Sequence, residues 1–460
     1  MKNILTALLF CALATTATAQ TFSTGMTFDD EAYAQTEQKA MLMTRDYQIV
    51  PAKYSLRDYT PVILNQAGGT CVGWSSTYYG RTILEAKAKN WMDKTVISDN
   101  AFAPYFTYTM IKRHQGCDEG TVITDALQML IDKGAPKKTD YHTPCAPTVA
   151  EAIIQKASPY KIKSYARLYD YEADFNVKKN AMQKSISNGN PVIIGMKCPD
   201  SFFRAKGFWQ PTEDYTKNFG GHAMCVIGYD DTMYGGSFEI VNSWGPSWGN
   251  QGYIWIKYDD FFKFTRYACE MIAFPSEKPA TQNDMAGEIA FKLSTGGNMQ
   301  ASYVKKAGSL GYYKVNQAYT SGTQFRIMIS NNEPAFVYAF GSDLTNELFT
   351  IFPHKAGISA ALNYASNNVA LPSEKHFIRM NETTGKDFMC VLYSKEKLDI
   401  EEIKQNVATQ TGTFAEKVQK ALANNLVLAN NVQYQASQMK FTAKSQGKSI
   451  TALMVEITHE

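Results

Sequence analysis

Two segments of the sequence carry the most information about the fold, Gly220-Gly221-His222-Ala223 and Val241-Asn242-Ser243-Trp244-Gly245. His222 opens an apolar run with strand character that ends at Asp230-Asp231, and Asn242 ends a second such run that begins at Phe238. Two strands that lie next to each other bring these two side chains together. The spacing therefore predicts an imidazole and an amide side by side at the end of a sheet.

A thiol precedes both segments, in Asn65-Gln66-Ala67-Gly68-Gly69-Thr70-Cys71. A Gly-rich loop with Thr70 as a possible cap leads into an apolar segment, which predicts a helix with Cys71 in its first turn. Peptide dipoles at a helix start and an imidazolium partner both lower a thiol pKa. A thiol also needs a base and a third group that orients the base, roles that Cys71, His222 and Asn242 can fill.

Each residue also has a plain structural interpretation. Cys71 taken alone fits a buried structural cysteine, His222 a satisfied core histidine and Asn242 a turn residue. Taken together and in this order, the three residues favour nucleophilic catalysis.

These segments resemble the papain family of cysteine peptidases. Gly-His-Ala, Asn-Ser-Trp-Gly and the following Trp248-Gly249-Asn250-Gln251-Gly252-Tyr253 carry the likeness, and Gln66 matches the glutamine upstream of the family's nucleophile. The resemblance covers about residues 50 to 275. It implies an α+β fold with two lobes, mostly helical before about residue 185 and a β-barrel-like sheet after it, with the site in the cleft between them.

The resemblance also implies roles for individual residues. Cys71 would be the nucleophile, His222 the general base and then the acid, and Asn242 the group that orients the imidazole. Gln66 and the Cys71 N–H would form the oxyanion hole, and Trp244 would shield the bond between Asn242 and His222 from water.

The sequence departs from the family around the nucleophile. Gly68-Gly69-Thr70-Cys71-Val72 lacks the family's first cysteine, and the step from Gln66 to Cys71 is one residue shorter, which the two glycines can absorb. Gly116-Cys117-Asp118-Glu119-Gly120-Thr121 is similar to the stretch that lines the family's non-prime subsites. The substrate-binding candidates are Glu119, Gly120, Gly221 and Trp244.

Cysteine usage and the first residues favour export. Residues 1–19 carry one lysine, a short apolar core and Ala17-Thr18-Ala19, which predicts a signal peptide cleaved before Gln20 and a periplasmic or extracellular location. No later segment is long and apolar enough to cross a bilayer. Since the family's usual partner for Cys117 is absent, the resemblance makes Cys117 with Cys145 a plausible substitute disulfide.

The remaining chain divides by composition. Residues 20–50 form a short, polar, weakly helical extension, which either blocks the site or leaves the enzyme without a zymogen restraint. Residues 51–276 are the predicted catalytic domain and 277–286 a linker. Residues 287–402 contain short strands and turns that predict a mainly-β sandwich, and residues 403–460 form a helix and strand extension.

Part of the sandwich region resembles a bacterial domain of unknown function that accompanies exported proteins, the DUF4384 family. The likeness rests on Glu333-Pro334-Ala335-Phe336-Val337-Tyr338, Phe352-Pro353 and Leu371-Pro372, with Leu392-Tyr393-Ser394 and Leu398-Asp399-Ile400. It implies an accessory role, such as docking to the envelope or to a protein partner.

The amino-acid composition and the net charge limit the classes of function that the sequence supports. The 45% hydrophobic and 13% aromatic content suits packed domains, and a net charge of +3 with no basic cluster offers no support for nucleic-acid binding. The sequence shows neither a zinc motif nor a phosphate loop, so no metal or cofactor is expected.

The predicted function is that of an exported cysteine endopeptidase that hydrolyses peptide or protein substrates through a thioester acyl-enzyme. Two alternatives stay open at this point. One is a cell-wall amidase or transpeptidase with the same Cys-His chemistry, and the other is a catalytically silent papain-like binding scaffold.

Overall fold

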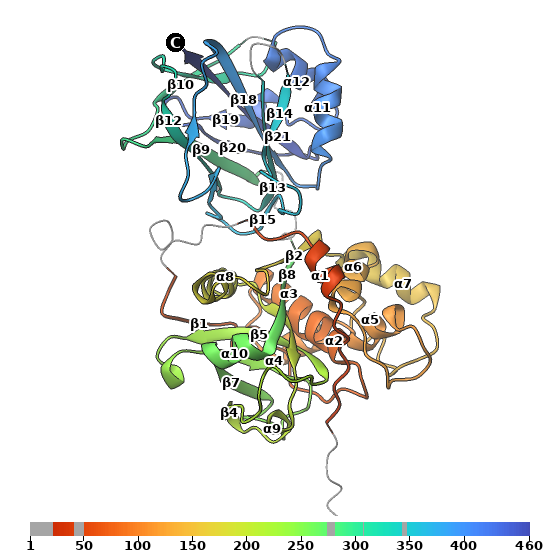
Figure 1. Ribbon diagram of the computed structural model, residues 1–460. Helices are drawn as coiled ribbons and strands as arrows, with labels where there is room; N and C mark the ends of the chain where they lie inside the picture. The colour runs from red at the N-terminus through yellow and green to blue at the C-terminus, as the bar shows by residue number, and fades with distance from the viewer. Residues whose placement is uncertain (1–21, 41–49, 274–280, 307, 343–346) are drawn as a thin grey trace, which may run out of the picture.

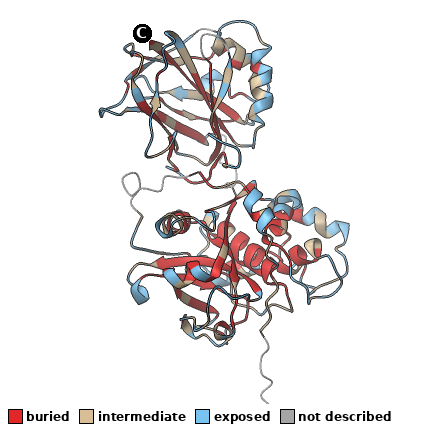
Figure 2. Cartoon of the chain, in the orientation of Figure 1, coloured by how far each residue is buried: buried red, intermediate tan, exposed pale blue. Residues whose placement is uncertain are grey.

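The chain folds into a first domain, residues 50–273, and a second domain, residues 281–460, each with its own hydrophobic core (Figure 2). A third buried cluster joins Ala166 and Ile272 of the first domain to apolar residues of the second. The computed structural model describes residues 22–40, 50–273, 281–306, 308–342 and 347–460. The predicted signal peptide, residues 1–19, lies outside the described residues, as does the start of the predicted linker. The linker's last residues already belong to a strand, because β9 begins at Met285.

The first domain combines a helical lobe with one sheet. Its helices are α2 (Cys71–Gly73), the π-helix η2 (Trp74–Arg81), α3 (Thr82–Ala88), α4 (Lys94–Asp99), α5 (Pro104–Ile111), α6 (Ile123–Asp132), α7 (Glu151–Ala157), α8 (Phe175–Ser187), α9 (Asp200–Phe203) and α10 (Tyr258–Phe264). Its strands are β1 (Lys53–Ser55), β2 (Ser164–Arg167), β3 (Val192–Lys197), β4 (Gly207–Trp209), β5 (Gly221–Asp230), β6 (Ser237–Val241), β7 (Tyr253–Lys257) and β8 (Thr265–Ile272).

The helical lobe forms around one almost fully buried run of helix. Residues 71–88 are helical without a break as α2, η2 and α3, and every residue from Cys71 to Leu84 is buried. Helix α6 packs beside this run with Ile123, Ala126, Leu127 and Leu130 buried, which is the i, i+3, i+4, i+7 pattern of an amphipathic helix. The expected side-chain cap by Thr70 is wrong, because its Oγ1 donates instead to the Ala67 carbonyl at 2.8 Å.

The sheet of the first domain has the strand order β2-β8-β3-β5-β6-β7-β4, and β1 pairs with β5. Nine of the ten residues of β5 are buried because the strand lies inside the sheet and is covered on both faces. In the antiparallel pairing of β5 with β6, Cys225 lies opposite Val241. Continuing this register puts Asn242 opposite Met224, so His222 and Asn242 share one face as diagonal neighbours.

The second domain contains two packed sheets and two helices. Their bounds are β9 (Met285–Leu293), β10 (Ala301–Val304), β11 (Tyr312–Val315), β12 (Gln324–Asn331), β13 (Ala335–Ser342), β14 (Leu348–Phe352), β15 (Ala361–Leu362), β16 (Val369–Leu371), β17 (Ile378–Arg379), β18 (Gly385–Ser394), α11 (Ile400–Ala408), α12 (Phe414–Leu422), β19 (Val432–Tyr434), β20 (Lys440–Ala443) and β21 (Ile450–His459). One sheet has the order β10-β11-β21-β18-β13-β14 and the other β16-β12-β9-β20-β19.

The predicted division of this region at residue 402 needs correction. Strand β21 lies inside the first of these sheets, between β11 and β18, and β20 pairs with β9 in the second (Figure 1). The last sixty residues therefore complete both sheets, since a central strand supplies hydrogen bonds to both of its neighbours. The one helix expected in the 403–460 extension is replaced by two helices, α11 and α12, with Gly412 at a φ of +115° before the Thr413–Glu416 capping box of α12.

A third feature is the N-terminal strap, which we define as residues 22–40. It runs along the first domain and reaches the second domain at its far end, and it contains the short helix α1 (Asp30–Gln35) (Figure 1). The Asp29 carboxylate caps α1 by accepting from the Ala32 N–H at 2.9 Å. Tyr33 fixes α1 to the first domain, because its ring stacks on Tyr267 and its hydroxyl donates to the Tyr169 carbonyl at 2.9 Å.

The position of β21 predicts a large cost for a cavity in that strand. Leu453 is fully buried, so Leu453→Ala should lower the free energy of unfolding of the second domain by about 2–5 kcal/mol. Leu428 is 59% exposed, and Leu428→Ala serves as the control that should change it by less than about 0.5 kcal/mol. Urea denaturation followed by circular dichroism measures both. Equal effects of the two substitutions would contradict a buried central β21.

Candidate active site

His222 and Asn242 meet at the end of the sheet, as the strand register requires. The ring nitrogen Nε2 of His222 lies 2.8 Å from Oδ1 of Asn242, and both residues are buried. The indole of Trp244 stacks on the imidazole with ring centroids 4.5 Å apart. The indole and the amide together hold the ring in one orientation and keep water from their hydrogen bond.

Cys71 begins the buried helix beside this pair. Its Sγ accepts from the Ala223 N–H at 3.4 Å, next in the chain to His222. Backbone hydrogen bonds from Ala223, Gly25 and Val72 act to lower the thiol pKa, but burial outweighs them and raises the pKa of Cys71 to about 12. In this covered state the thiol is neutral, so it is not a nucleophile at neutral pH.

Burial acts on the imidazole in the opposite direction. It lowers the pKa of His222 to about 4, although the hydrogen bond to Asn242 partly raises it. Among the described residues, Nδ1 of His222 has no hydrogen-bond partner. With Nε2 engaged by Asn242, Nδ1 is the nitrogen left to exchange a proton with a thiol.

Gln66 is held at the same place by the loop after β6. Its backbone N–H donates to the Ser243 carbonyl at 2.8 Å, and its side-chain Oε1 accepts from the Ser243 hydroxyl at 2.6 Å. These contacts aim Nε2 at two carbonyls, those of Ser23 at 3.0 Å and Gly68 at 2.7 Å. The shortened loop is accommodated by Gly68, whose φ is +54° and whose Cβ would lie 2.4 Å from the Cys117 carbonyl.

The strap passes directly over the thiol. The Met26 N–H donates to the Gly221 carbonyl at 3.0 Å on one wall. On the other wall, the Thr121 N–H donates to the Gly25 carbonyl at 2.9 Å, and the Thr27 N–H donates to the Thr121 carbonyl at 3.0 Å. The strap therefore bridges the two lobes as an extra strand, antiparallel at Gly221 and parallel at Thr121.

Glycines of the first domain make room for this segment. A Cβ at Gly221 would lie 2.3 Å from the Met26 carbonyl oxygen, and one at Gly195 would lie 2.7 Å from the Met26 Sδ. Gly25 of the strap is packed just as closely against the groove, since a Cβ at Gly25 would lie 2.0 Å from the Gly69 carbonyl oxygen. Side chains at Gly221 and Gly25 would keep the strap out of the groove, whereas at Gly195 the nearest strap atom belongs to the flexible end of the Met26 side chain.

The first residues of the strap lie on the far side of the thiol. The Ser23 carbonyl accepts from Nε2 of Gln66 and also from Nε1 of Trp244, the latter at 2.8 Å. The ring of Phe22 stacks on Trp244 with centroids 5.1 Å apart. Residues 22–27 thus contact Cys71, Gln66, Gly120, Gly221 and Trp244.

The structure brings Cys71, His222, Asn242, Gln66 and Trp244 together, and it places Gly120 and Gly221 on opposite walls of the groove. Glu119 differs, because its carboxylate is half-exposed and lies 3.5 Å from Nε2 of His114. Its proposed substrate contact stays a prediction. The sequence did not reveal Thr121 or the individual strap residues, since backbone pairing leaves little trace in residue type.

The predicted disulfide between Cys117 and Cys145 is present. It ties the loop that supports Gly69, whose N–H donates to the Cys117 carbonyl at 2.6 Å. Cys198, Cys225, Cys269 and Cys390 are buried free cysteines.

Within the part of the chain that the structure describes, no group of three or more His, Cys, Asp or Glu side chains is arranged to hold a metal ion. The described helices are too short or too polar to cross a membrane.

Comparison with known families agrees with this geometry. Residues 61–272 match the family model described as "Papain family cysteine protease". This part of the chain is a papain-like domain. Residues 318–397 match the "Domain of unknown function (DUF4384)", which places that family in the second domain.

Relatives with printed names match the papain-like domain over part of their length. The chain is 24% identical to "Cathepsin B-like CP2" of Giardia intestinalis over 227 residues, which is 45% of this chain and 69% of that protein. It is 30% identical to "Vignain" of Vigna mungo over 145 residues, 31% of this chain and only 38% of that protein. Together with the family model, these matches support a papain-like cysteine peptidase domain.

Among solved structures, Xylellain, a cysteine protease from Xylella fastidiosa, aligns with a TM-score of 0.44 and 19% identity. The alignment covers 55% of this chain and 96% of that one.

The pKa of His222 predicts that acid loosens the strap. The covered imidazole has a pKa of about 4, whereas a solvated one has a pKa of about 6.5. The covered state binds fewer protons than the open state, so strap docking is fully stable above about pH 6.5. As the pH falls from there toward 4, the docking equilibrium constant should decrease by up to about tenfold per pH unit. Amide hydrogen exchange of Met26 and Thr27, corrected for the intrinsic rate, measures this in a Cys71→Ala chain.

The matched control is Cys71→Ala/His222→Gln, which has no imidazole to protonate. Its protection should be independent of pH between 6.5 and 4.5. The same pH dependence in both chains would assign the effect to another group.

Proposed function

We propose that this chain is an exported papain-like cysteine endopeptidase that is made in a latent form, with the N-terminal strap lying across its active site. The observation that carries the proposal is the strap itself, which covers Cys71 and pairs with Gly221 and Thr121 as a bound peptide would. A groove that binds one extended peptide by its backbone is suited to a peptide substrate. The disulfide supports an oxidising compartment and hence export.

The mechanism follows from the positions of the side chains once the strap has left. His222 takes the Cys71 proton through Nδ1, while Asn242 holds Nε2. The thiolate attacks the peptide carbonyl carbon, and the oxyanion is stabilised by Nε2 of Gln66 and the Cys71 N–H. The imidazolium then protonates the leaving amine. Finally, His222 removes a proton from water, which attacks the thioester and releases the acid and the thiol.

The strap's direction predicts that it is not itself a substrate. A substrate runs from the non-prime subsites, predicted around Gly120, toward the leaving-group side near Trp244. The strap runs the opposite way, with Phe22 at Trp244 and Thr27 at Thr121. It presents the Gly25 amide to Sγ, whereas hydrolysis requires a carbonyl carbon there.

Displacing the strap should uncover the thiol. In the full chain, Gly25→Ala places a methyl group against the Gly69 backbone. Overpacking of this kind costs about 1–3 kcal/mol, so alkylation of Cys71 by an epoxide that reacts with papain-type thiolates should be roughly 5- to 150-fold faster. Mass spectrometry gives the rate. Ser23→Ala is the control, because the contacts of Ser23 described above use only its carbonyl.

Labelling should be accompanied by cleavage of a mixed peptide library, and Cys71→Ala should abolish both. Absence of labelling in Gly25→Ala and in a chain lacking residues 20–50, with both folded by circular dichroism, would favour the silent scaffold. Turnover of muropeptides without turnover of peptides or proteins would favour the cell-wall amidase or transpeptidase.

The oxyanion role of Gln66 has its own test. In the Gly25→Ala background, Gln66→Ala should lower kcat by roughly 100-fold or more, since one donor to the oxyanion is lost. KM should change far less. Gln128→Ala is the control, because Gln128 is exposed on α6. A fall in kcat of less than threefold for Gln66→Ala would remove Gln66 from the oxyanion hole.

A further inference from the structure

The far end of the strap lies between the two domains and is hydrogen-bonded to both. On the side of the papain-like domain, the Lys39 N–H donates to the Arg167 carbonyl at 2.8 Å. In return, the Arg167 N–H donates to the backbone carbonyl of Glu37 at 2.9 Å. On the side of the second domain, the Gln38 N–H donates to the Gly357 carbonyl at 2.6 Å, and the Ser359 N–H donates to the backbone carbonyl of Gln38 at 2.8 Å. Three consecutive strap residues thus join the free edge of β2 to a loop of the second domain.

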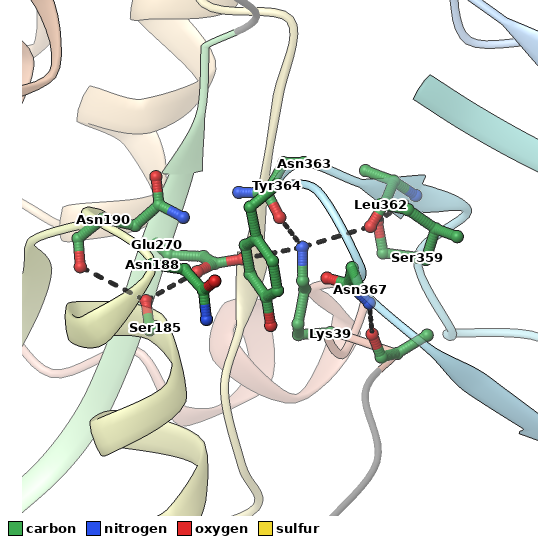
Figure 3. Close-up of polar contacts among 12 residues, drawn as sticks. Lys39, Ser185, Asn188, Asn190, Glu270, Ser359, Leu362, Asn363, Tyr364 and Asn367 are labelled. Atoms are coloured by element: carbon green, nitrogen blue, oxygen red, sulfur yellow. Dashed lines mark hydrogen bonds and ion pairs between the residues drawn. The ribbon is translucent and has the colours of Figure 1, made fainter. Parts of the chain in front are cut away.

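The Lys39 side chain adds a buried polar contact to this backbone pairing (Figure 3). Its ammonium group forms an ion pair with Glu270 of β8 at 3.0 Å, and both side chains are fully buried. From the second domain, the Ala361 carbonyl at 3.1 Å and Oδ1 of Asn363 accept from the same group. A buried charge is stable only when its hydrogen bonds are satisfied, so Lys39 requires partners from both domains.

Two more contacts come from the second domain alone. Nδ2 of Asn367 donates to the Ala40 carbonyl at 3.0 Å, and Ala40 is buried in the core of that domain. Lys397 forms an ion pair with Glu37 at 2.7 Å nearer the surface. The preceding residue, Glu396, forms an ion pair with Lys163 of the papain-like domain at 2.6 Å, and this contact does not involve the strap.

We propose that the second domain is a binding module for residues 37–40 of this chain, and that by holding them it keeps the strap docked over Cys71. This inference rests on the proposed peptidase function and assigns a role to the DUF4384 domain. The extended backbone of residues 37–39, paired on both edges, and the buried lysine between two domains are the features that define the site.

By holding residues 37–40, the second domain acts on residues 22–28 through the chain segment that joins the two parts of the strap. Residues 22–28 and helix α1 directly precede the held residues in the chain, so a segment that leaves the groove remains close and binds again at a high effective concentration. When residues 37–40 are no longer fixed, the segment gains conformational freedom and the open state becomes more populated.

The test compares the rate of epoxide labelling of Cys71 in full-length variants. Asn363→Ala/Asn367→Ala removes two hydrogen bonds from the second domain to the strap, one of them to a charged group. Labelling should become about tenfold faster. Lys397→Gln, which breaks an ion pair near the surface, should give a rise of about two- to fivefold. Glu396→Gln is the matched control for it and should label at the wild-type rate.

Hydrogen exchange of residues 37–39 and of 23–27 accompanies the labelling. Faster exchange in both segments is expected for the Asn363→Ala/Asn367→Ala chain. Faster exchange at 37–39 with unchanged labelling would overturn the proposal, as would equal labelling of Lys397→Gln and Glu396→Gln. If the double variant does not fold, as judged by its melting curve, the comparison of Lys397→Gln with Glu396→Gln decides alone.

The result is separable from the peptidase proposal. Fast labelling and cleavage by Gly25→Ala, together with wild-type labelling by the second-domain variants, overturns only the role of the second domain. Failure of both Gly25→Ala and the folded chain lacking residues 20–50 to label or cleave overturns the peptidase function itself.

Discussion

The backbone pairing of Met26 with Gly221 on one wall and of its neighbours with Thr121 on the other determines the state of this active site. It closes the groove between the lobes and takes the thiol and the imidazole out of water. Desolvation disfavours the charged form of each group, so it raises the pKa of Cys71 and lowers that of His222. The strap contributes to this burial together with Trp244, which stacks on the imidazole.

Close approach is possible because the groove has little side-chain bulk where the strap passes. Gly221 lies so close to the Met26 carbonyl oxygen, and Gly25 of the strap so close to the Gly69 backbone, that neither position has room for a Cβ. A substrate backbone would use the same space. The features that make the groove suitable for a peptide are therefore those that let the chain's own N-terminal segment occupy it.

The second domain is joined to this arrangement by the strap as well as by direct contact. Its two sheets are completed by strands from the last sixty residues, so it forms one unit with its own core. Residues 37–40 then lie between that unit and the edge of β2. The fully buried Lys39 and Glu270 show how closely the three parts fit, since an ammonium group excluded from water requires several partners.

By itself, the sequence determined the identity and order of the catalytic candidates and the division into a mixed α/β region and a β-rich region. These features follow from residue type and local periodicity, which short motifs and apolar runs record directly. Only the tertiary structure decided that residues 22–27 cover Cys71, that β21 lies inside its sheet and that Lys39 is buried between domains. Each of these depends on backbone pairing between segments far apart in the chain, and backbone hydrogen bonds are nearly independent of side-chain identity.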